Sequence, residues 1–288
     1  MVDKTAERDM SISLEFAQKI KNQNRRDKIT KYSPAIVLLG LIAVFAVIAP
    51  GFFSLTNMMT ILTQIATPLV LALGLTFVVL TGSIDLSIDG TMGLAGTVVG
   101  FLVANNQNSM DLGVFGILIA VMIGMLSGLA IGCIYVKARI PSFMVSYGMS
   151  SITSGIAQSI NGSLPATITS EGFRGLALHS FLGLPYITWL ALALFLVAYI
   201  IQEKTAFGRC LFAVGANEKI PKMSGVNVER VKILAFVWAG LCIGLAGVIG
   251  AARLGQGTIL VGRNNLFPTM TAVVVGGTLF SGGKGGVL

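Results

Sequence analysis

Two carboxylates, Asp85 and Asp89, stand in the stretch "TGSIDLSIDG", between two runs that are apolar enough to lie in a membrane. A spacing of four residues would place them on one face of a helix. Carboxylates in such surroundings are costly and usually functional, so one interpretation is a proton or cation site. The other is capping: Ser83 or Asp85 caps the next helix, and Asp89 lies in its first turn, where the dipole favours an anion. We favour capping and turn geometry over a direct transport role.

Catalytic and cofactor motifs have little support elsewhere in the chain. His179 is the single histidine, without a second histidine or a nearby cysteine to make a metal site. No "GxSxG" motif of a serine hydrolase occurs. In "SGGKGG" (281–286), Gly285 follows Lys284 where a phosphate-binding loop needs Ser or Thr. We therefore expect no enzyme activity, no ATP site, no metal and no cofactor on this chain.

The composition is that of a membrane protein. Charged residues make up 11% of the chain, against about 25% in soluble proteins, and hydrophobic residues make up 54%. Apolar blocks of roughly 17–25 residues recur, each long enough to cross a bilayer. We predict an all-α polytopic helical bundle in which residues 34–288 form one transmembrane domain. Its eight expected spans lie near 34–50, 58–81, 86–104, 112–136, 140–160, 183–202, 231–252 and 266–281.

Glycine and proline predict how these helices pack and where they break. The segments 124–132 and 240–250 carry small residues at helical spacing, which allows membrane helices to approach closely. Pro68 should kink the second span. Gly276 and Gly277 should break the eighth, and broken segments in membranes usually line a cavity or pack against protein.

The basic residues predict the orientation in the membrane. With the N-terminus inside, 16 of the 20 Lys and Arg residues fall on the inner side: in a cytoplasmic tail (1–33), the turn 137–139 and the loop 203–232. Such an excess is typical of cytoplasmic segments. The net charge of +8 therefore indicates membrane topology, and we expect no nucleic-acid partner.

An internal repeat joins two distant parts of the chain. Residues 78–90 align without gaps on residues 273–285, and Gly82 then matches Gly277. Paired, glycine-interrupted apolar segments are typical of internally duplicated transporters. The apolar segment that follows the first copy has no counterpart after the second. We therefore expect the C-terminus to be truncated, with about eight of roughly ten spans present.

The loop 203–232 is the longest between the spans and mixes charged with apolar residues. Within it, "NEKIPKMSGV" is expected to form a short helix that ends at Gly225. Loops on a helical scaffold are where binding surfaces usually lie. The apolar residues favour docking onto another protein, and the alternative is a solvated linker whose charges set the topology.

Four blocks of the sequence carry a resemblance to a known family: "LGLTFVVLTGSIDLSIDG", "KARIPSFMVSYGMSSITSGIA", "TAFGRCLFAVGANEKIPKMSGVNVERVKILAFVWAGLCIGLAGVIGAARLG" and "AVVVGGTLFSGGKGGVL". In order and content, over about residues 36–288, the chain resembles the permease subunit of bacterial ABC sugar importers of the ribose/xylose/galactose/arabinose type.

The resemblance implies a multi-pass protein of the bacterial inner membrane that translocates a monosaccharide. Its implied partners are a second permease copy or sister permease, a periplasmic sugar-binding protein, membrane lipid, and a cytoplasmic ATPase that holds ATP and Mg²⁺. The loop 203–232 would be the ATPase-coupling loop, with Phe207, Gly208, Arg209, Phe212, Gly215, Asn217, Glu218, Ile220, Met223 and Gly225. Residues expected to cap helices or organise the pathway are Ser83, Asp85, Ser87, Asp89, Gly276 and Gly277.

The chain departs from the family at two places. The family commonly has Gly at the position of Asp89, and Glu and Asp at the positions of Leu266 and Pro268. These differences leave the sugar unspecified and indicate a local role for Asp89. A proton-coupled secondary transporter that uses Asp85 and Asp89 is the alternative function.

Overall fold

The computed structural model describes residues 36–162 and 164–287, in two units that divide after Ser54. The described part of the first unit is an apolar helix, Ile36–Ile48, followed by a turn in which Phe52 stacks on Phe45 with ring centroids 6.1 Å apart. The expected cytoplasmic tail (1–33) lies outside the described residues.

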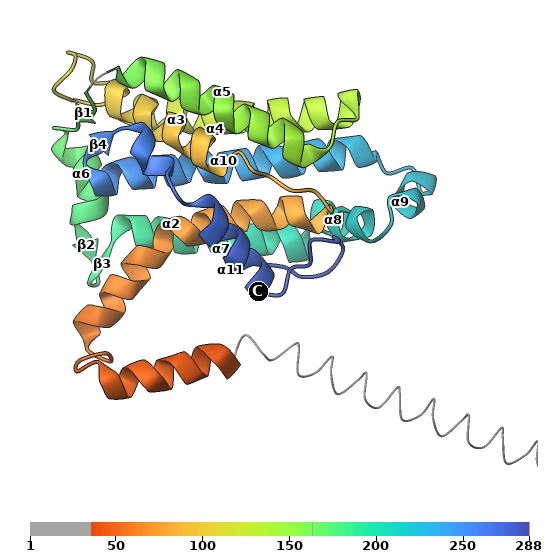
Figure 1. Ribbon diagram of the computed structural model, residues 1–288, viewed down its shortest axis with the longest axis horizontal. Helices are drawn as coiled ribbons and strands as arrows, with labels where there is room; N and C mark the ends of the chain where they lie inside the picture. The colour runs from red at the N-terminus through yellow and green to blue at the C-terminus, as the bar shows by residue number, and fades with distance from the viewer. Residues whose placement is uncertain (1–35, 163, 288) are drawn as a thin grey trace, which may run out of the picture. The chain divides into compact units, whose positions relative to one another are not determined.

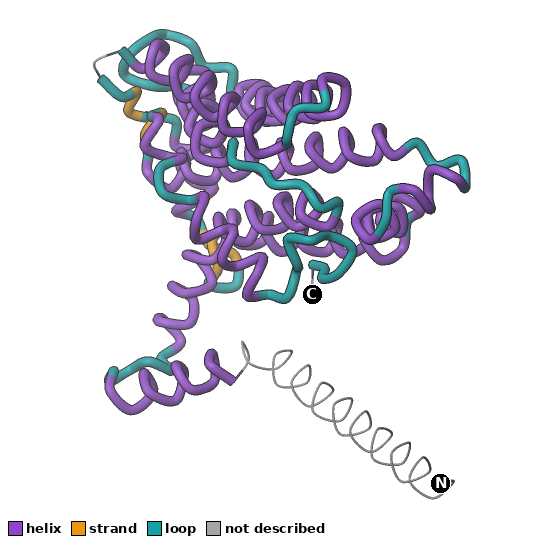
Figure 2. The backbone as a smooth tube through the Cα atoms, turned by 45° about the vertical axis from the view of Figure 1, so that its right-hand side comes forward, coloured by secondary structure: helices purple, strands orange, loops and turns teal. Residues whose placement is uncertain are grey.

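The second unit is a helical bundle (Figures 1 and 2). Its larger helices are α2 (Leu55–Leu80), α3 (Ile88–Leu102), α4 (Val114–Ala138), α5 (Ser142–Asn161), α7 (Tyr186–Lys204), α10 (Val228–Leu254) and α11 (Leu266–Val275). Its smaller ones are α6 (Glu171–Leu178), α8 (Ala206–Ala216), α9 (Lys219–Met223) and the 3-10 turn η1 (Ile259–Gly262). The all-α fold class is confirmed, and a helix occupies each of the eight predicted spans.

The helices differ in whether they could cross a membrane. Within the described residues, α2, α4, α7 and α10 are long and apolar enough to do so. In contrast, α3 has 15 residues and α11 has 10, below the roughly 20 that a hydrocarbon core needs. Figure 1 also shows that α2 bends along its course, and Pro68 lies inside this helix.

The core forms where α2, α3 and α10 meet. Phe77 of α2 is fully buried and lies 5.3 Å from the ring of Trp238 on α10, between centroids. Met92 of α3 and Ile249 of α10 are also buried. Because α4 and α7 bury much smaller shares of their surfaces than α2 and α10, they cover the outside of this core.

Glycines let α4 and α10 pack backbone against backbone. A side chain at Gly128 would collide with the carbonyl of Phe236, and one at Gly124 would collide with the backbone of Gly240 and Gly244. The prediction that small residues in 124–132 and 240–250 mark close helix packing is thereby confirmed.

Two short sheets lie at one end of the bundle, with α6, and α8 and α9 lie at the other end (Figure 1). Strand β1 (Ala166–Thr167) pairs antiparallel with β4 (Gln256–Gly257), with Ala166 opposite Gly257. Strand β2 (Ser180–Phe181) pairs with β3 (Leu184–Pro185) across a two-residue turn. Both turn residues, Leu182 and Gly183, have positive φ, as a type I′ hairpin requires.

The two copies of the sequence repeat end their helices in the same way. After α2, the N–H of Ser83 donates to Val78 O and the N–H of Gly82 to Val79 O. After α11, Thr278 and Gly277 repeat these bonds 195 residues later, to the carbonyls of Val273 and Val274. Gly82 and Gly277 both have positive φ (74° and 99°). This pattern is a Schellman motif, which needs glycine at that position, so the local structure supports the repeat.

Candidate functional site

The segment 81–87 connects α2 to α3 through a turn at 81–82 and a non-helical stretch at 83–87. Its side chains alternate: Ser83, Asp85 and Ser87 are buried, and Ile84 and Leu86 are half-buried. In Figure 1 it runs back from the end of α2 alongside the bundle before α3 begins. The backbone of this segment therefore lies inside the protein.

Three serines on one face of α5 supply hydrogen-bond acceptors for this segment and for the first turn of α3. The hydroxyls of Ser142, Ser146 and Ser150 accept from the N–H groups of Ile84 (3.0 Å), Leu86 (2.9 Å) and Gly90 (3.2 Å). Two extended residues advance the chain by about 6.6 Å, and four helical residues rise by about 6 Å. The i, i+4 spacing of Ser142 and Ser146 thus matches the alternate N–H groups of Ile84 and Leu86, and Ser150 accepts from Gly90 in the first turn of α3. These serines were missed from sequence, although their spacing was a readable signal.

Asp85 does not share a helix face with Asp89 and does not cap α3. The helix begins only at Ile88, with Ser87 as its N-cap residue and no side-chain cap from Ser87. The Asp85 carboxylate is 1% exposed and accepts the N–H of Ser87 at 2.8 Å, which closes a local turn. The acceptor for the first turn of α3 comes instead from Ser150, across the interface with α5. The prediction that Ser83 or Asp85 caps α3 is therefore wrong, whereas Asp89 lies in the first turn of this helix as expected.

Asp89 caps another helix, α11. Its Oδ1 accepts the N–H of Asn265 at 3.1 Å and the N–H of Leu266 at 2.8 Å, and these two residues begin α11. A carboxylate at this position satisfies free N–H groups and complements the positive end of the helix dipole. This contact gives Asp89 a structural role at the start of α11.

Gly276 and Gly277 end α11, as predicted, and the chain then folds back. The N–H of Gly283 donates to the carbonyl of Leu80, the last residue of α2, at 2.9 Å. Gly215 of α8 also lies against this carbonyl, with no room for a side chain. The end of α2, the helix α8 and the segment after α11 therefore pack together.

The loop 203–232 consists mainly of α8 and α9. Thr205 caps α8 by accepting the N–H of Gly208 at 3.2 Å, and Gly208 itself has no room for a side chain beside Gln202. Phe207 and Phe212 are half-buried and pack into this chain's own core. These two predicted coupling residues are therefore only partly accessible to a partner protein.

Helix α9 presents the residues that lie open to a partner. Ile220 is 64% exposed and Met223 is 89% exposed. Arg209, Asn217 and Gly225 are also exposed. The short helix predicted in "NEKIPKMSGV" is confirmed as Lys219–Met223, followed by Gly225 with positive φ. Apolar side chains this exposed beside charged ones are typical of a docking surface.

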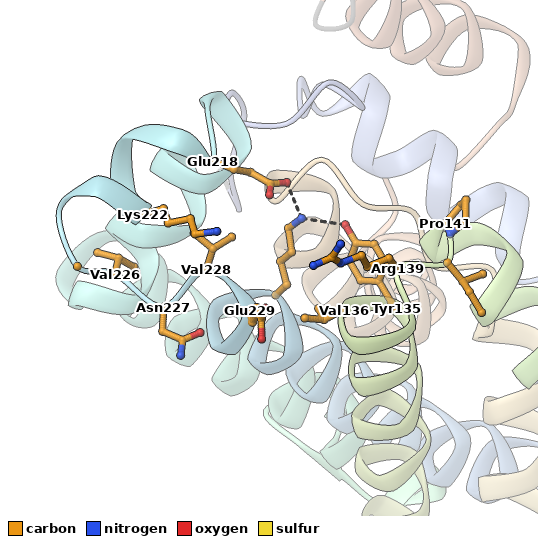
Figure 3. A pocket seen from close by; sticks show the side chains of 13 residues that line it. Tyr135, Val136, Arg139, Pro141, Glu218, Lys222, Val226, Asn227, Val228 and Glu229 are labelled. Atoms are coloured by element: carbon orange, nitrogen blue, oxygen red, sulfur yellow. Dashed lines mark hydrogen bonds and ion pairs between the residues drawn. The ribbon is translucent and has the colours of Figure 1, made fainter.

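A buried lysine joins α9 to α4 and α10. Lys232 is 8% exposed, is ion-paired with Glu218, and donates to the hydroxyl of Tyr135 at 3.0 Å. Figure 3 shows these two contacts at the side of a cavity of about 790 Å³, whose walls include Arg139 and Glu229. Glu218 was predicted as a coupling residue, and its carboxylate is engaged within this chain. From the sequence, Lys232 was counted only among the basic residues that predict the orientation in the membrane.

The described residues form a helical bundle with four helices long and apolar enough to cross a membrane. The broken-helix segment 81–87 lies inside this bundle, and the helices α8 and α9 lie at one end of it. Residues 57–287 match the family model of the branched-chain amino acid transport system / permease component. The chain belongs to this family of permease components.

Individual relatives in this family are similar over most of the chain. The ribose import permease protein RbsC of Escherichia coli (strain K12) is 32% identical over 257 residues, which cover 88% of this chain and 79% of that protein. The galactose/methyl galactoside import permease protein MglC of Salmonella typhimurium (strain LT2) is 32% identical over 268 residues, 88% of this chain and 80% of that protein. The probable ABC transporter permease protein YphD of Escherichia coli (strain K12) is 34% identical over 250 residues, 87% and 74% respectively. No solved structure matches the chain.

Proposed function

We propose that this chain is the membrane-spanning permease subunit of an ATP-binding-cassette importer that carries a monosaccharide. The observation that carries the proposal is the identity of 32% to both a ribose and a galactose import permease over 88% of the chain. The four long apolar helices fit a permease. The contact of Asp89 with α11 gives this carboxylate a structural role in place of the proton carrier of the alternative function.

The proposal includes partners that supply energy and substrate. A separate ATPase holds ATP and Mg²⁺ and docks on α8 and α9, with Ile220 and Met223 as its apolar contacts. A periplasmic sugar-binding protein docks at the opposite end, and a second permease completes the pathway. Interface energy concentrates in a few packed apolar side chains, which supports exposed Ile220 and Met223 as anchors.

The proposal places the chain in the bacterial inner membrane with α8 and α9 on the cytoplasmic side. Support comes from the charges: Lys204, Arg209, Lys219, Lys222 and Arg230 cluster in this loop. Half-buried Cys210 lies in the same loop. In intact spheroplasts it should escape a membrane-impermeant maleimide, and in inside-out vesicles it should react. Labelling in intact spheroplasts would invert the orientation.

The function is tested by uptake in proteoliposomes that contain this chain with a partner ATPase and a sugar-binding protein. Labelled ribose and galactose are the probes. Uptake should require ATP and persist when a protonophore removes the proton gradient. Uptake that needs the gradient and ignores ATP would establish the proton-coupled alternative.

A separate variant tests the proposal that the ATPase docks on α8 and α9. Ile220→Asp should abolish uptake and the stimulation of ATP hydrolysis, because a charge replaces an apolar anchor. Lys219→Gln, next to it on the exposed surface, should change uptake little. Normal uptake by Ile220→Asp in an assembled complex would make the loop a linker.

A further inference from the structure

An unbroken line of polar side chains joins the exposed helix α9 to the buried segment 81–87. Glu218, the N-cap residue of α9, is ion-paired with Lys232 of α10. The ammonium of Lys232 donates to the hydroxyl of Tyr135 at 3.0 Å. That hydroxyl accepts from Ser83 at 3.2 Å, and Ser83 Oγ lies 3.1 Å from Thr81 Oγ1. The line therefore crosses from α9 through α10 and α4 to the residue that follows the end of α2.

Burial strengthens the hydrogen bonds along this line. Lys232 is 8% exposed and Ser83 is 1% exposed. Polar groups in such surroundings strengthen one another's hydrogen bonds. The side chain of Glu218 is 54% exposed, so when it moves away the Lys232 ammonium keeps the Tyr135 hydroxyl as its acceptor. Lys232 also lies over the ring of Tyr135, 5.1 Å from its centroid. A displacement of Glu218 therefore changes the hydrogen bond between the Lys232 ammonium and the Tyr135 hydroxyl.

A cavity borders the line beside α9, and Lys222 of α9 also lines it. The cavity of about 790 Å³ separates the α4–α5 turn, with Arg139 and Pro141, from the turn before α10, with Asn227 (Figure 3). At the far end of the line, Ser83 begins the stretch in which the N–H groups of Ile84 and Leu86 donate to serines of α5.

We propose that Lys232 and Tyr135 are positioning residues that transmit the position of α9 to the segment 81–87. The inference rests on the proposed function, in which a partner ATPase docks on α9 and the broken-helix segment belongs to the transport pathway. A partner that pulls on Ile220 and Met223 moves Glu218, and Lys232 and Tyr135 pass this movement to Ser83.

The test uses this chain alone, in lipid nanodiscs, so that it succeeds or fails independently of the ATPase and the sugar. A Leu86→Cys variant reports on the segment, because Leu86 is half-buried. Half-buried Cys133 and Cys210 are changed to alanine. The measurement is the rate at which the reporter thiol reacts with a maleimide.

Breaking either end of the line should alter this rate. We expect Glu218→Gln and Tyr135→Phe each to change it about 5-fold or more, as coupled neighbours do. The double variant should match the larger single effect, because either change interrupts the same line. Glu229→Gln is the matched control: Glu229 lines the same cavity and is exposed, so its rate should stay within about 2-fold of the parent.

Two further variants separate transmission from damage to the fold. Tyr135→Phe keeps the ring that packs on Phe236 at 5.8 Å between centroids, so the variant should stay folded, with its melting temperature lowered only as far as the loss of one buried hydroxyl requires. The charge exchange Glu218→Lys with Lys232→Glu restores an ion pair and should return the rate toward the parental value. Additive effects of Glu218→Gln and Tyr135→Phe, or a rate that neither changes, would overturn the proposal and leave Lys232 as a local anchor of α9.

Discussion

Replacing Asp89 should loosen α11 while the rest of the bundle stays folded. The carboxylate accepts two backbone N–H groups at the start of α11, at 3.1 and 2.8 Å. Hydrogen bonds to charged groups are worth about 1.5–3 kcal/mol each. Both bonds here share one oxygen of a half-buried side chain, so we expect Asp89→Ala to cost about 2–3 kcal/mol in the local stability of α11. Asp89→Asn keeps the acceptor and loses the charge, which should cost about 1 kcal/mol.

Hydrogen exchange measures this effect directly. In the detergent-solubilised chain, amides of residues 266–275 should exchange about 30- to 150-fold faster in Asp89→Ala, since each 1.4 kcal/mol is a factor of ten. Amides of α10 serve as the internal reference. Glu229→Ala is the matched control, because Glu229 is an exposed first-turn acid of α10. Unchanged exchange of α11 in Asp89→Ala would refute the capping argument. Loss of uptake in Asp89→Asn with α11 still protected would point to the proton-coupled alternative.

Two further predictions concern packing inside the bundle. Ser146→Ala removes the acceptor for the N–H of Leu86 and should cost about 1–3 kcal/mol. It should therefore lower the melting temperature. The control Ser151→Ala, whose exposed hydroxyl bonds within its own helix, should have little effect. Equal melting temperatures would contradict the role assigned to the serines of α5. Gly128→Val forces a side chain into the backbone of α10 and should destabilise far more than Gly148→Val, which enters open space. Similar losses in the two valine variants would mean that helix propensity, and not close packing, is what the glycine provides.

The sequence alone determined the features that depend on local composition. Hydropathy located a helix in each predicted span, because burial in lipid requires apolar residues over a whole segment. Gly82 and Gly277 marked the ends of α2 and α11, because a helix that ends in a Schellman motif needs positive φ at one residue. The short helix in "NEKIPKMSGV" was equally readable.

The partners of the polar residues depend on how distant helices pack. Asp89 contacts Asn265, 176 residues away, and Ser146 contacts Leu86, 60 residues away. A spacing of four residues predicted a shared helix face for Asp85 and Asp89. The serines of α5 accept backbone bonds that would otherwise require a helix, so α3 begins only at Ile88. Polar groups inside a membrane protein must find a hydrogen-bond partner somewhere. The sequence shows that such groups are present, and the packing of distant helices determines which partner each one takes.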